Sequence, residues 1–311
     1  MKSLASTATG RSRLVQQLLD WSELCKPRLS ALVLVTVAAG YALATVSGVA
    51  FMPDAMALIG ALLGVSLTAA GGATLNQVLE RHLDARMERT KLRPIAAGRI
   101  SPWAATLFGI AAAVAGWLVL DGVVHRLAAV LALISVVNYV VIYTPLKRVT
   151  TFNTLVGAIT GALPPVIGWT AATGALEPQA WALFAVLFVW QLPHFLAVAW
   201  LYRDDYAKGG MKMLSVADPN GRVTMRQILL FSLTMLPASL LPAVAGLAGL
   251  PYAVTALVLG GAILVLALQL VRLRTQDAAR RLFLGSVIYL PLLLIVLIVD
   301  SATGGGRWGA G

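Results

Sequence analysis

The sequence contains one cysteine, Cys25, and only three histidines among its 311 residues. A single cysteine cannot form an internal disulfide, and it excludes a cluster of thiolate metal ligands. Charged residues are also scarce, at 12% of the chain, which is about half of what a soluble globular domain carries. The composition therefore excludes an ordinary soluble domain and a cysteine-bound metal centre.

Apolar residues make up 59% of the chain and lie in long runs without charge. Several runs exceed about 18 residues, the length that crosses a bilayer as a helix. Hydropathy predicts nine spans, at residues 29–50, 55–76, 103–120, 124–143, 152–172, 180–201, 227–248, 252–271 and 282–299. The fold class expected is an all-α integral membrane protein with nine transmembrane helices.

Acidic residues are few, 13 against 24 basic ones, and the net charge is +11. Nucleic-acid binding is one interpretation of such a charge, but the basic residues lie in short loops between the spans. With the N-terminus inside, 22 of the 24 basic residues fall on the inner side, and only Arg126 and Arg307 fall outside. This distribution indicates a cytoplasmic N-terminus and no nucleic-acid partner.

The spans divide the chain into three regions. Residues 1–28 form a predicted cytoplasmic leader, 29–300 a single transmembrane domain, and 301–311 a short extracytoplasmic tail. The leader has no short apolar core with a small-residue cleavage site, so it is not interpreted as a signal peptide. Its shortness favours the inner membrane of a bacterial cell over the mitochondrial inner membrane.

Two inner loops, 77–101 and 202–226, are long and mixed in charge. They follow spans 2 and 6, four spans apart, which predicts a repeat of four spans, doubled, with a ninth added. Both loops are then expected at one cytoplasmic mouth.

The first loop region contains an acidic pattern with a spacing of four residues. Asn76, Glu80, Asp84 and Glu88 share one face of a helix at this spacing. Stacked carboxylates repel one another, so a purely structural helix gains nothing from them, whereas hard oxygen ligands for a divalent cation require this arrangement. Glu88 has a second interpretation, as the ion-pair partner of nearby basic residues.

Prolines mark two expected irregularities. Pro94 cannot continue a helix, so the acidic helix is predicted to end near Arg93. Pro164 and Pro165 are predicted to interrupt the fifth span, and a break at membrane depth is tolerated where the backbone lines a cavity.

A second acidic cluster, Asp204 and Asp205, lies in the other polar loop between Arg203 and Lys208. Two acidic clusters interleaved with basic residues on one side of the membrane predict a diphosphate site. Carboxylates would hold Mg²⁺, the metal would bridge phosphate oxygens, and Arg or Lys would neutralise the remaining charge.

The acidic pattern resembles the first motif of the UbiA-type intramembrane prenyltransferases, Asn-x-x-x-Asp-x-x-x-Asp, with Glu80 in place of the middle aspartate. Further segments are similar to the branch of this family that prenylates haem: Lys26-Pro27-Arg28, Tyr143 to Arg148, Gly161 to Pro165, Pro193-His194-Phe195 and Asp205-Tyr206. The resemblance runs from about residue 22 to residue 300, and the segments occur in the family's order.

The resemblance implies a UbiA-like bundle and Mg²⁺-dependent transfer of a farnesyl group from farnesyl diphosphate to a vinyl group of haem B, forming haem O. It implies catalytic and metal-ligating roles for Asn76, Glu80, Asp84, Asp204 and Asp205. It implies diphosphate contacts by Arg28, Arg89, Arg93, Lys147, Arg203 and Lys208, and haem contacts by His194 and Tyr206. The lipid bilayer is an expected partner, and so is a haem A synthase or a terminal oxidase under assembly.

Alternatives remain open at the level of sequence. His194 is either a haem contact or a hydrogen-bonded histidine beside Pro193, and Lys147 is either a phosphate contact or a positive-inside anchor. Another acceptor, a quinone precursor or chlorophyllide, would leave the enzyme class unchanged. A secondary transporter is the alternative from another class, although a transporter needs its carboxylates near the membrane midplane.

Overall fold

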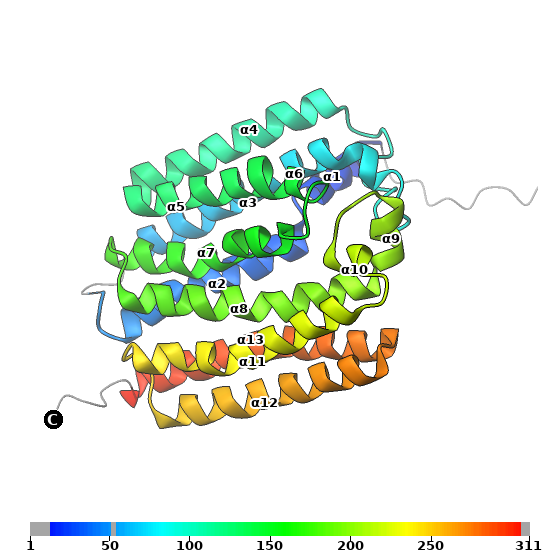
Figure 1. Ribbon diagram of the computed structural model, residues 1–311. Coiled ribbons are helices and arrows are strands. Elements are labelled where there is room, and N and C mark those ends of the chain that lie inside the picture. Colours follow the sequence, from blue (N-terminus) through cyan, green and yellow to red (C-terminus); the bar gives the residue numbers. More distant parts are fainter. Residues whose placement is uncertain (1–12, 51–53, 306–311) are drawn as a thin grey trace, which may run out of the picture.

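The computed structural model describes residues 13–50 and 54–305, which form helices joined by loops, with no strand among them (Figure 1). Nine helical segments in this part of the chain are long and apolar enough to cross a membrane, as predicted. They are α2 (Pro27–Val46), α3 (Ala55–Asp84), α4 with η1 (Pro102–Val119, Leu120–Val124), α5 with η2 and α6 (Arg126–Val137, Asn138–Tyr143, Thr144–Leu146), α7 (Asn153–Thr173), α8 (Pro178–Leu201), α11 (Arg222–Val244), α12 (Leu250–Leu273) and α13 (Gln276–Ala302).

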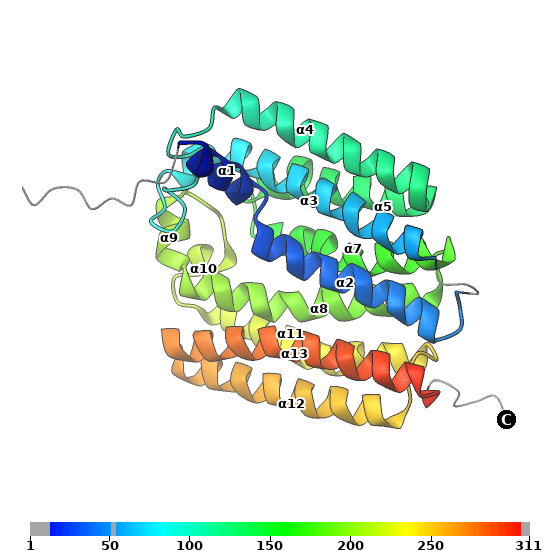
Figure 2. The same cartoon turned by 180° about the vertical axis from the view of Figure 1, so that it is seen from behind.

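Three short helices complete the described chain: α1 (Arg13–Leu24), α9 (Arg203–Lys208) and α10 (Leu214–Ala217). All three gather at one end of the bundle, and the last turn of α13 lies at the other end (Figures 1 and 2). A chain that crosses the membrane an odd number of times must begin and end on opposite sides. The positions of α1 and of the last turn of α13 agree with this expectation.

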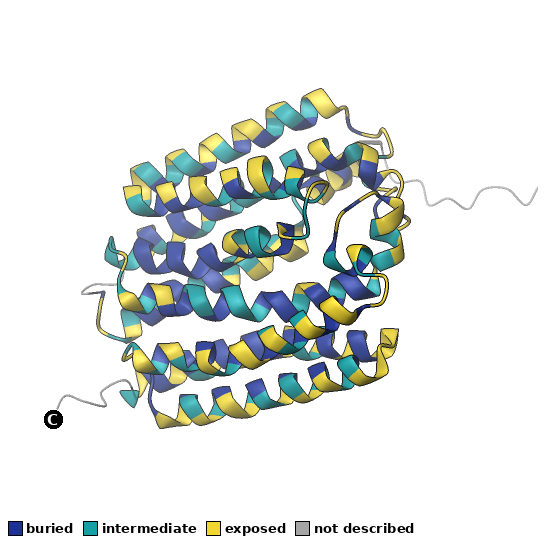
Figure 3. Ribbon diagram, viewed as in Figure 1, coloured by how far each residue is buried: buried dark blue, intermediate teal, exposed yellow. Residues whose placement is uncertain are grey.

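The core lies along α7 and α8, which are the most buried of the spans (Figure 3). The outer helices α4 and α12 expose many large apolar side chains, such as Leu118 and Val258. Water would be a poor surrounding for such a surface, whereas lipid acyl chains match it. Burial therefore distinguishes a central pair of helices from a lipid-facing rim.

Small residues bring the helices close together. A Cβ atom on Gly40 of α2 would lie 1.9 Å from the carbonyl oxygen of Pro165 on α7, and one on Gly168 would lie 1.9 Å from the carbonyl oxygen of Val37. Helices in lipid associate through such backbone approaches, because lipid tails remove the hydrophobic driving force. The tight contact fixes α2 against α7, and both helices line the cavity described below.

The acidic pattern differs from its prediction in one respect. Helix α3 extends beyond the predicted span and carries Asn76, Glu80 and Asp84 to its last turn, but it ends at Asp84 and not near Arg93. Glu88 therefore lies in a turn and pairs with Lys91, which agrees with the second interpretation given for it. The helix ends early because contacts remote in sequence hold the turn: the side chain of Met87 is fully buried beneath it, and a carboxylate from the other polar loop accepts its amide protons.

The predicted break at Pro164 and Pro165 is wrong, because α7 runs without interruption from Asn153 to Thr173. Neighbouring helices support prolines inside transmembrane helices, so no break is needed. The expected cavity is nevertheless present. Gly157, Gly161 and Pro164 of α7 all line it.

Candidate active site

A cavity of about 420 Å³ lies inside the bundle toward the end where α9 and α10 sit. Residues from α2, α3, α5, η2, α7 and α8 line it, together with the loop after α3. Its polar lining consists mainly of Lys26, Asn76, Glu80, Asp84, Arg89, Arg93, Tyr143, Lys147 and Tyr206. The remainder is mainly apolar, with side chains such as Val33, Val65 and Ile167, and includes the uncharged polar residues Ser30, Thr68, Ser135, Thr160 and Gln191. The cavity thus has the two surfaces that an anionic head group with an apolar tail would need.

Glu80 projects from α3 into this cavity and is 3% exposed. Its Oε1 accepts a hydrogen bond of 2.8 Å from Nζ of Lys147, which follows α6 and also lies over the Tyr143 ring at 4.4 Å. Burial alone would lower the pKa of Lys147, but the neighbouring Tyr143 and Glu80 outweigh it and raise the pKa above the ordinary lysine value. Lys147 is therefore a permanent cation at the cavity wall.

Asp84 is the last residue of α3 and is 1% exposed. Both of its carboxylate oxygens accept hydrogen bonds of 2.8 Å from Nη1 of Arg93. The loop between them folds back on itself, and the Thr90 hydroxyl donates to the backbone oxygen of Asp84. A buried ion pair contributes little net stability because both charges lose their hydration. Two such pairs on one cavity wall are therefore typical of a binding site.

Asn76 joins α3 to α6, the segment after η2. Its Nδ2 donates to the Thr144 hydroxyl at 2.9 Å, and its Oδ1 accepts from Nζ of Lys26 at 3.4 Å. Lys26 has a φ of 48°, a left-handed conformation that costs a residue with a side chain about 1–2 kcal/mol. Such strain is retained mainly where function needs it.

Lys26 lines the cavity, but it is not among the metal and diphosphate contacts predicted from the sequence. Burial, and then the positive charges of Arg93 and Lys147, lower its pKa to about 7. The Lys-Pro pair before the first span was its only sequence signal. Its strained backbone and its place in the cavity depend on contacts that a motif does not contain.

The segment η2 is a π-helical turn, a feature that often occurs at functional sites. It places Tyr139 and Tyr143 against each other, with ring centroids 5.8 Å apart, and both line the cavity. Asn138 fixes the turn by donating to the backbone oxygen of Val156 and to the Thr160 hydroxyl of α7, each at 2.8 Å. The aromatic wall is thereby tied to the central helix.

The two polar loops meet, as the repeat predicts. Asp205 of α9 accepts the amide protons of Glu88 at 3.2 Å and Arg89 at 3.1 Å. The Arg89 guanidinium lies over the rings of Tyr202 at 5.2 Å and Tyr206 at 5.7 Å. These contacts place Arg89 and Tyr206 in the cavity lining.

The other residues of the second acidic cluster lie outside the cavity. The Asp204 side chain is 82% exposed and lies 3.5 Å from Arg203, and neither residue lines the cavity. Lys208 and Asp205 are also absent from its lining. Ligation of a second ion by Asp204 and Asp205, and phosphate contacts by Arg203 and Lys208, stay predictions.

His194 faces away from the cavity. Its Nδ1 lies 2.8 Å from the Ser286 hydroxyl of α13, and its ring packs between Trp190 at 5.2 Å and Phe283 at 5.1 Å. The next residue, Phe195, lines the cavity instead. The hydrogen-bonded interpretation describes these contacts, and a haem contact by His194 stays a prediction.

A magnesium ion suits the donors at the polar end of the cavity. Among the residues that the structure describes, no three His, Cys, Asp or Glu side chains are grouped so that they could hold a metal ion by themselves. Mg²⁺ needs fewer protein ligands than that, because it is usually bound by one or two carboxylates together with substrate phosphates. Glu80 and Asp84, with the amide oxygen of Asn76, supply this set on successive turns of α3.

The described part of the chain thus has nine helical segments suited to a membrane, and several of its helices line a cavity with a charged end and a mainly apolar interior. Such a cavity suits an amphiphilic anion. The family model of the UbiA prenyltransferase family matches residues 33–293, and the chain belongs to this family. It is therefore a transferase, which sets the transporter alternative aside.

Curated relatives cover nearly the whole chain. A protoheme IX farnesyltransferase of Solibacter usitatus is 41% identical over 286 residues, which are 90% of this chain and 98% of the relative. A protoheme IX farnesyltransferase of Anaeromyxobacter sp. is 44% identical over 301 residues, which are 95% and 99% of the two chains.

Solved structures share the fold at low identity. A digeranylgeranylglyceryl phosphate synthase gives a TM-score of 0.76 at 14% identity and covers 93% of this chain and 99% of its own. A UbiA homologue from Archaeoglobus fulgidus, bound to GPP and Mg²⁺, gives 0.56 at 15% identity and covers 89% and 99%. The UbiA-like bundle expected from the motifs is confirmed.

Proposed function

We propose that this protein transfers the farnesyl group of farnesyl diphosphate to a vinyl group of haem B, forming haem O. One observation carries the proposal: a single cavity joins the ion-paired Glu80 and Asp84 to an apolar interior. The relatives named protoheme IX farnesyltransferase, at 40–44% identity over most of the chain, support haem as the acceptor.

Magnesium is part of the proposal. Glu80, Asp84 and Asn76 would hold the ion, and the bound ion would supply positive charge that stabilises the departing diphosphate. Four basic side chains that line the cavity would donate hydrogen bonds to the phosphate oxygens: Lys26, Arg89, Arg93 and Lys147. Two of these cations would be in position before the substrate arrives, because Lys147 is paired with Glu80 and Arg93 with Asp84.

The apolar interior protects the reaction. The bond between the allylic carbon and oxygen breaks, diphosphate leaves, and the allylic carbon forms a bond to the terminal carbon of the vinyl group. Water then adds to the remaining carbocation and loses a proton, which gives the hydroxyethylfarnesyl group. Side chains such as Val33, Val65 and Ile167 keep water from the first cation, and the faces of nearby aromatic rings such as Tyr139 favour positive charge.

The location follows from the same proposal. The polar end of the bundle faces the cytoplasm of a bacterial cell in the inner membrane, in agreement with the basic inner loops. An association with haem A synthase or with a terminal oxidase under assembly would pass the product on, and it stays an expectation.

The experiment is production of haem O. The chain is expressed in bacterial cells that lack haem O synthesis, and extracted haems are separated by chromatography. We expect a haem O peak, and in isolated membranes with added haem B and farnesyl diphosphate we expect EDTA to abolish it and Mg²⁺ to restore it. Absence of the product from correctly inserted protein would refute the acceptor, and turnover unaffected by EDTA would refute the role of the metal.

A further inference from the structure

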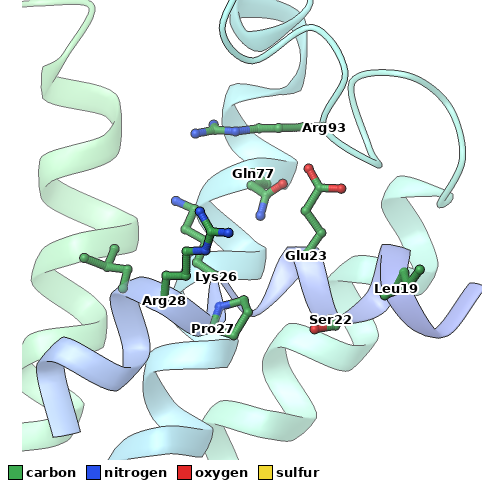
Figure 4. A pocket seen from close by; sticks show the side chains of 9 residues that line it. Leu19, Ser22, Glu23, Lys26, Pro27, Arg28, Gln77 and Arg93 are labelled. Carbon is green, nitrogen blue, oxygen red and sulfur yellow. The ribbon is translucent and has the colours of Figure 1, made fainter. Parts of the chain in front are cut away.

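A second pocket, of about 500 Å³, lies beside the cavity between α1, the start of α2 and α3 (Figure 4). Its charged lining residues are Glu23, Lys26, Arg28 and Arg93. The cavity has three lining residues in common with this pocket, and they form the shared wall: Lys26, Leu29 and Arg93. We call this second site the Arg28 pocket.

Arg28 is the charged lining residue of this pocket that makes no hydrogen bond or ion pair within the described part of the chain. Lys26 donates to the amide oxygen of Asn76, which carries no charge, and Arg93 is held by Asp84. Lys26 and Arg28 point into the same space below the Arg93 guanidinium, and Glu23 lies across from them (Figure 4). Arg99 holds Glu23 at 3.3 Å, so the pocket's one carboxylate already has a partner.

The positive charge of the pocket therefore favours an anionic ligand, and the residues that line the pocket indicate which kind of anion it can bind. Arg28 does not line the cavity where Lys147, Arg93 and the carboxylates would hold the diphosphate. Leu19, Pro27 and Leu29 supply apolar surface beside the cations. An acceptor with an apolar body and carboxylates at one edge matches this lining, and the shared lining residues make the pocket and the cavity direct neighbours.

We propose that the Arg28 pocket binds the propionate carboxylates of the haem acceptor, with Arg28 as the primary contact. This inference rests on the proposed function and makes that function more specific. The carboxylate edge would sit at the polar end of the bundle, where arginine is well hydrated and not buried in lipid. The vinyl edge, on the opposite side of the macrocycle, would then face the cavity that holds the allylic carbon. With this assignment, Arg28 is no longer one of the residues expected to contact the diphosphate.

The test compares two acceptors and three variants. Purified protein in detergent is assayed with haem B and with its dimethyl ester, which has no carboxylate charge. We expect Arg28→Gln to raise KM for haem B about tenfold, the loss typical of one charge-assisted hydrogen bond, with KM for farnesyl diphosphate at the wild-type value. Arg28→Lys should restore most of the affinity. Arg226→Gln is the matched control, because Arg226 is an exposed basic residue in the first turns of α11 and lines neither pocket.

The dimethyl ester distinguishes a loss of carboxylate binding from a general loss of activity in the Arg28→Gln variant. Wild type should use it as poorly as Arg28→Gln uses haem B, and Arg28→Gln should lose nothing further on it. If Arg28→Gln raises KM for farnesyl diphosphate and not for haem B, Arg28 contacts the diphosphate and the proposal is wrong. An equal loss on both acceptors, or wild-type use of the ester as good as of haem B, would overturn the proposal.

A binding measurement keeps the two proposals distinct. Haem B and its dimethyl ester are titrated into the protein without farnesyl diphosphate, and binding is followed by absorbance. If wild type binds haem B at least tenfold more tightly than the ester and Arg28→Gln removes the difference, the pocket is supported even if no haem O forms. If no difference appears while haem O is formed, the pocket assignment fails and the proposed function stands.

Discussion

Each carboxylate of the cavity wall is held by a basic residue from another segment. Glu80 pairs with Lys147 at 2.8 Å, 67 positions away, and Asp84 pairs with Arg93 at 2.8 Å. The spacing of the acidic motif predicted that the carboxylates share a helix face, and the structure places both on α3. Their partners could not be assigned from the sequence, because several arginines and lysines lie equally near in the loops and only the tertiary fold selects among them.

Asp84 provides the sharpest test at this scale. Asp84→Asn keeps the shape but removes the charge that would hold Mg²⁺ and that now pairs with Arg93. We expect turnover to fall by at least about 100-fold, since metal-assisted charge stabilisation is worth several kcal/mol. Haem O formed per unit of membrane-inserted protein is the measurement.

The matched control is Glu88→Gln, which removes an equal charge four residues later. Glu88 lies outside the cavity lining and pairs with Lys91 at the surface, where an ion pair contributes at most about 1 kcal/mol. It should retain activity. Equal losses in the two variants would mean that the loop needs its total charge and that Asp84 has no special role.

At the scale of the elements, the largest difference from the sequence-based prediction is the loop that follows α3, where a helix was expected. Regular spacing favoured a helix through Glu88 as far as Arg93, yet the helix ends at Asp84. No proline or glycine occurs between these positions to signal the end. Asp205, more than a hundred residues away, holds the turn, and a contact of that separation leaves no local pattern. The nine spans were predictable because lipid imposes a length and an apolar composition on each one.

This loop gives a prediction about Asp205. Asp205→Asn can accept at only one of the two amides, so we expect the turn to lose about 1–2 kcal/mol and to hold Arg89 and Arg93 less firmly. KM for farnesyl diphosphate should rise, and proteolysis in the 85–93 segment should become faster. Asp204→Asn is the comparison, because Asp204 points to solvent. If the two aspartates instead ligate a second ion, both variants should lose turnover together and the proteolysis rate should not change.

At the scale of the molecule, the bundle has a polar end that carries α1, α9 and α10 and an opposite end where α13 finishes. The predicted inner position of 22 of the 24 basic residues favours a cytoplasmic location for the polar end. Farnesyl diphosphate, an anion with a water-soluble head group, would then enter the cavity from the cytoplasm. The single cysteine makes this orientation directly measurable. Replacing Cys25 by Ser leaves a background with no thiol, in which one new cysteine reports one side of the membrane.

Asn220→Cys and Thr303→Cys are suited to that background, because both residues are exposed and lie at opposite ends of the bundle, before α11 and after α13. We expect a membrane-impermeant maleimide to label Asn220→Cys only in inside-out vesicles and Thr303→Cys only in right-side-out vesicles. Labelling of both after detergent is the control for reactivity. The reverse pattern would place the carboxylates and the Arg28 pocket on the outer face. A cytoplasmic supply of the diphosphate substrate could then not reach the cavity, because charge on the diphosphate prevents it from crossing the bilayer.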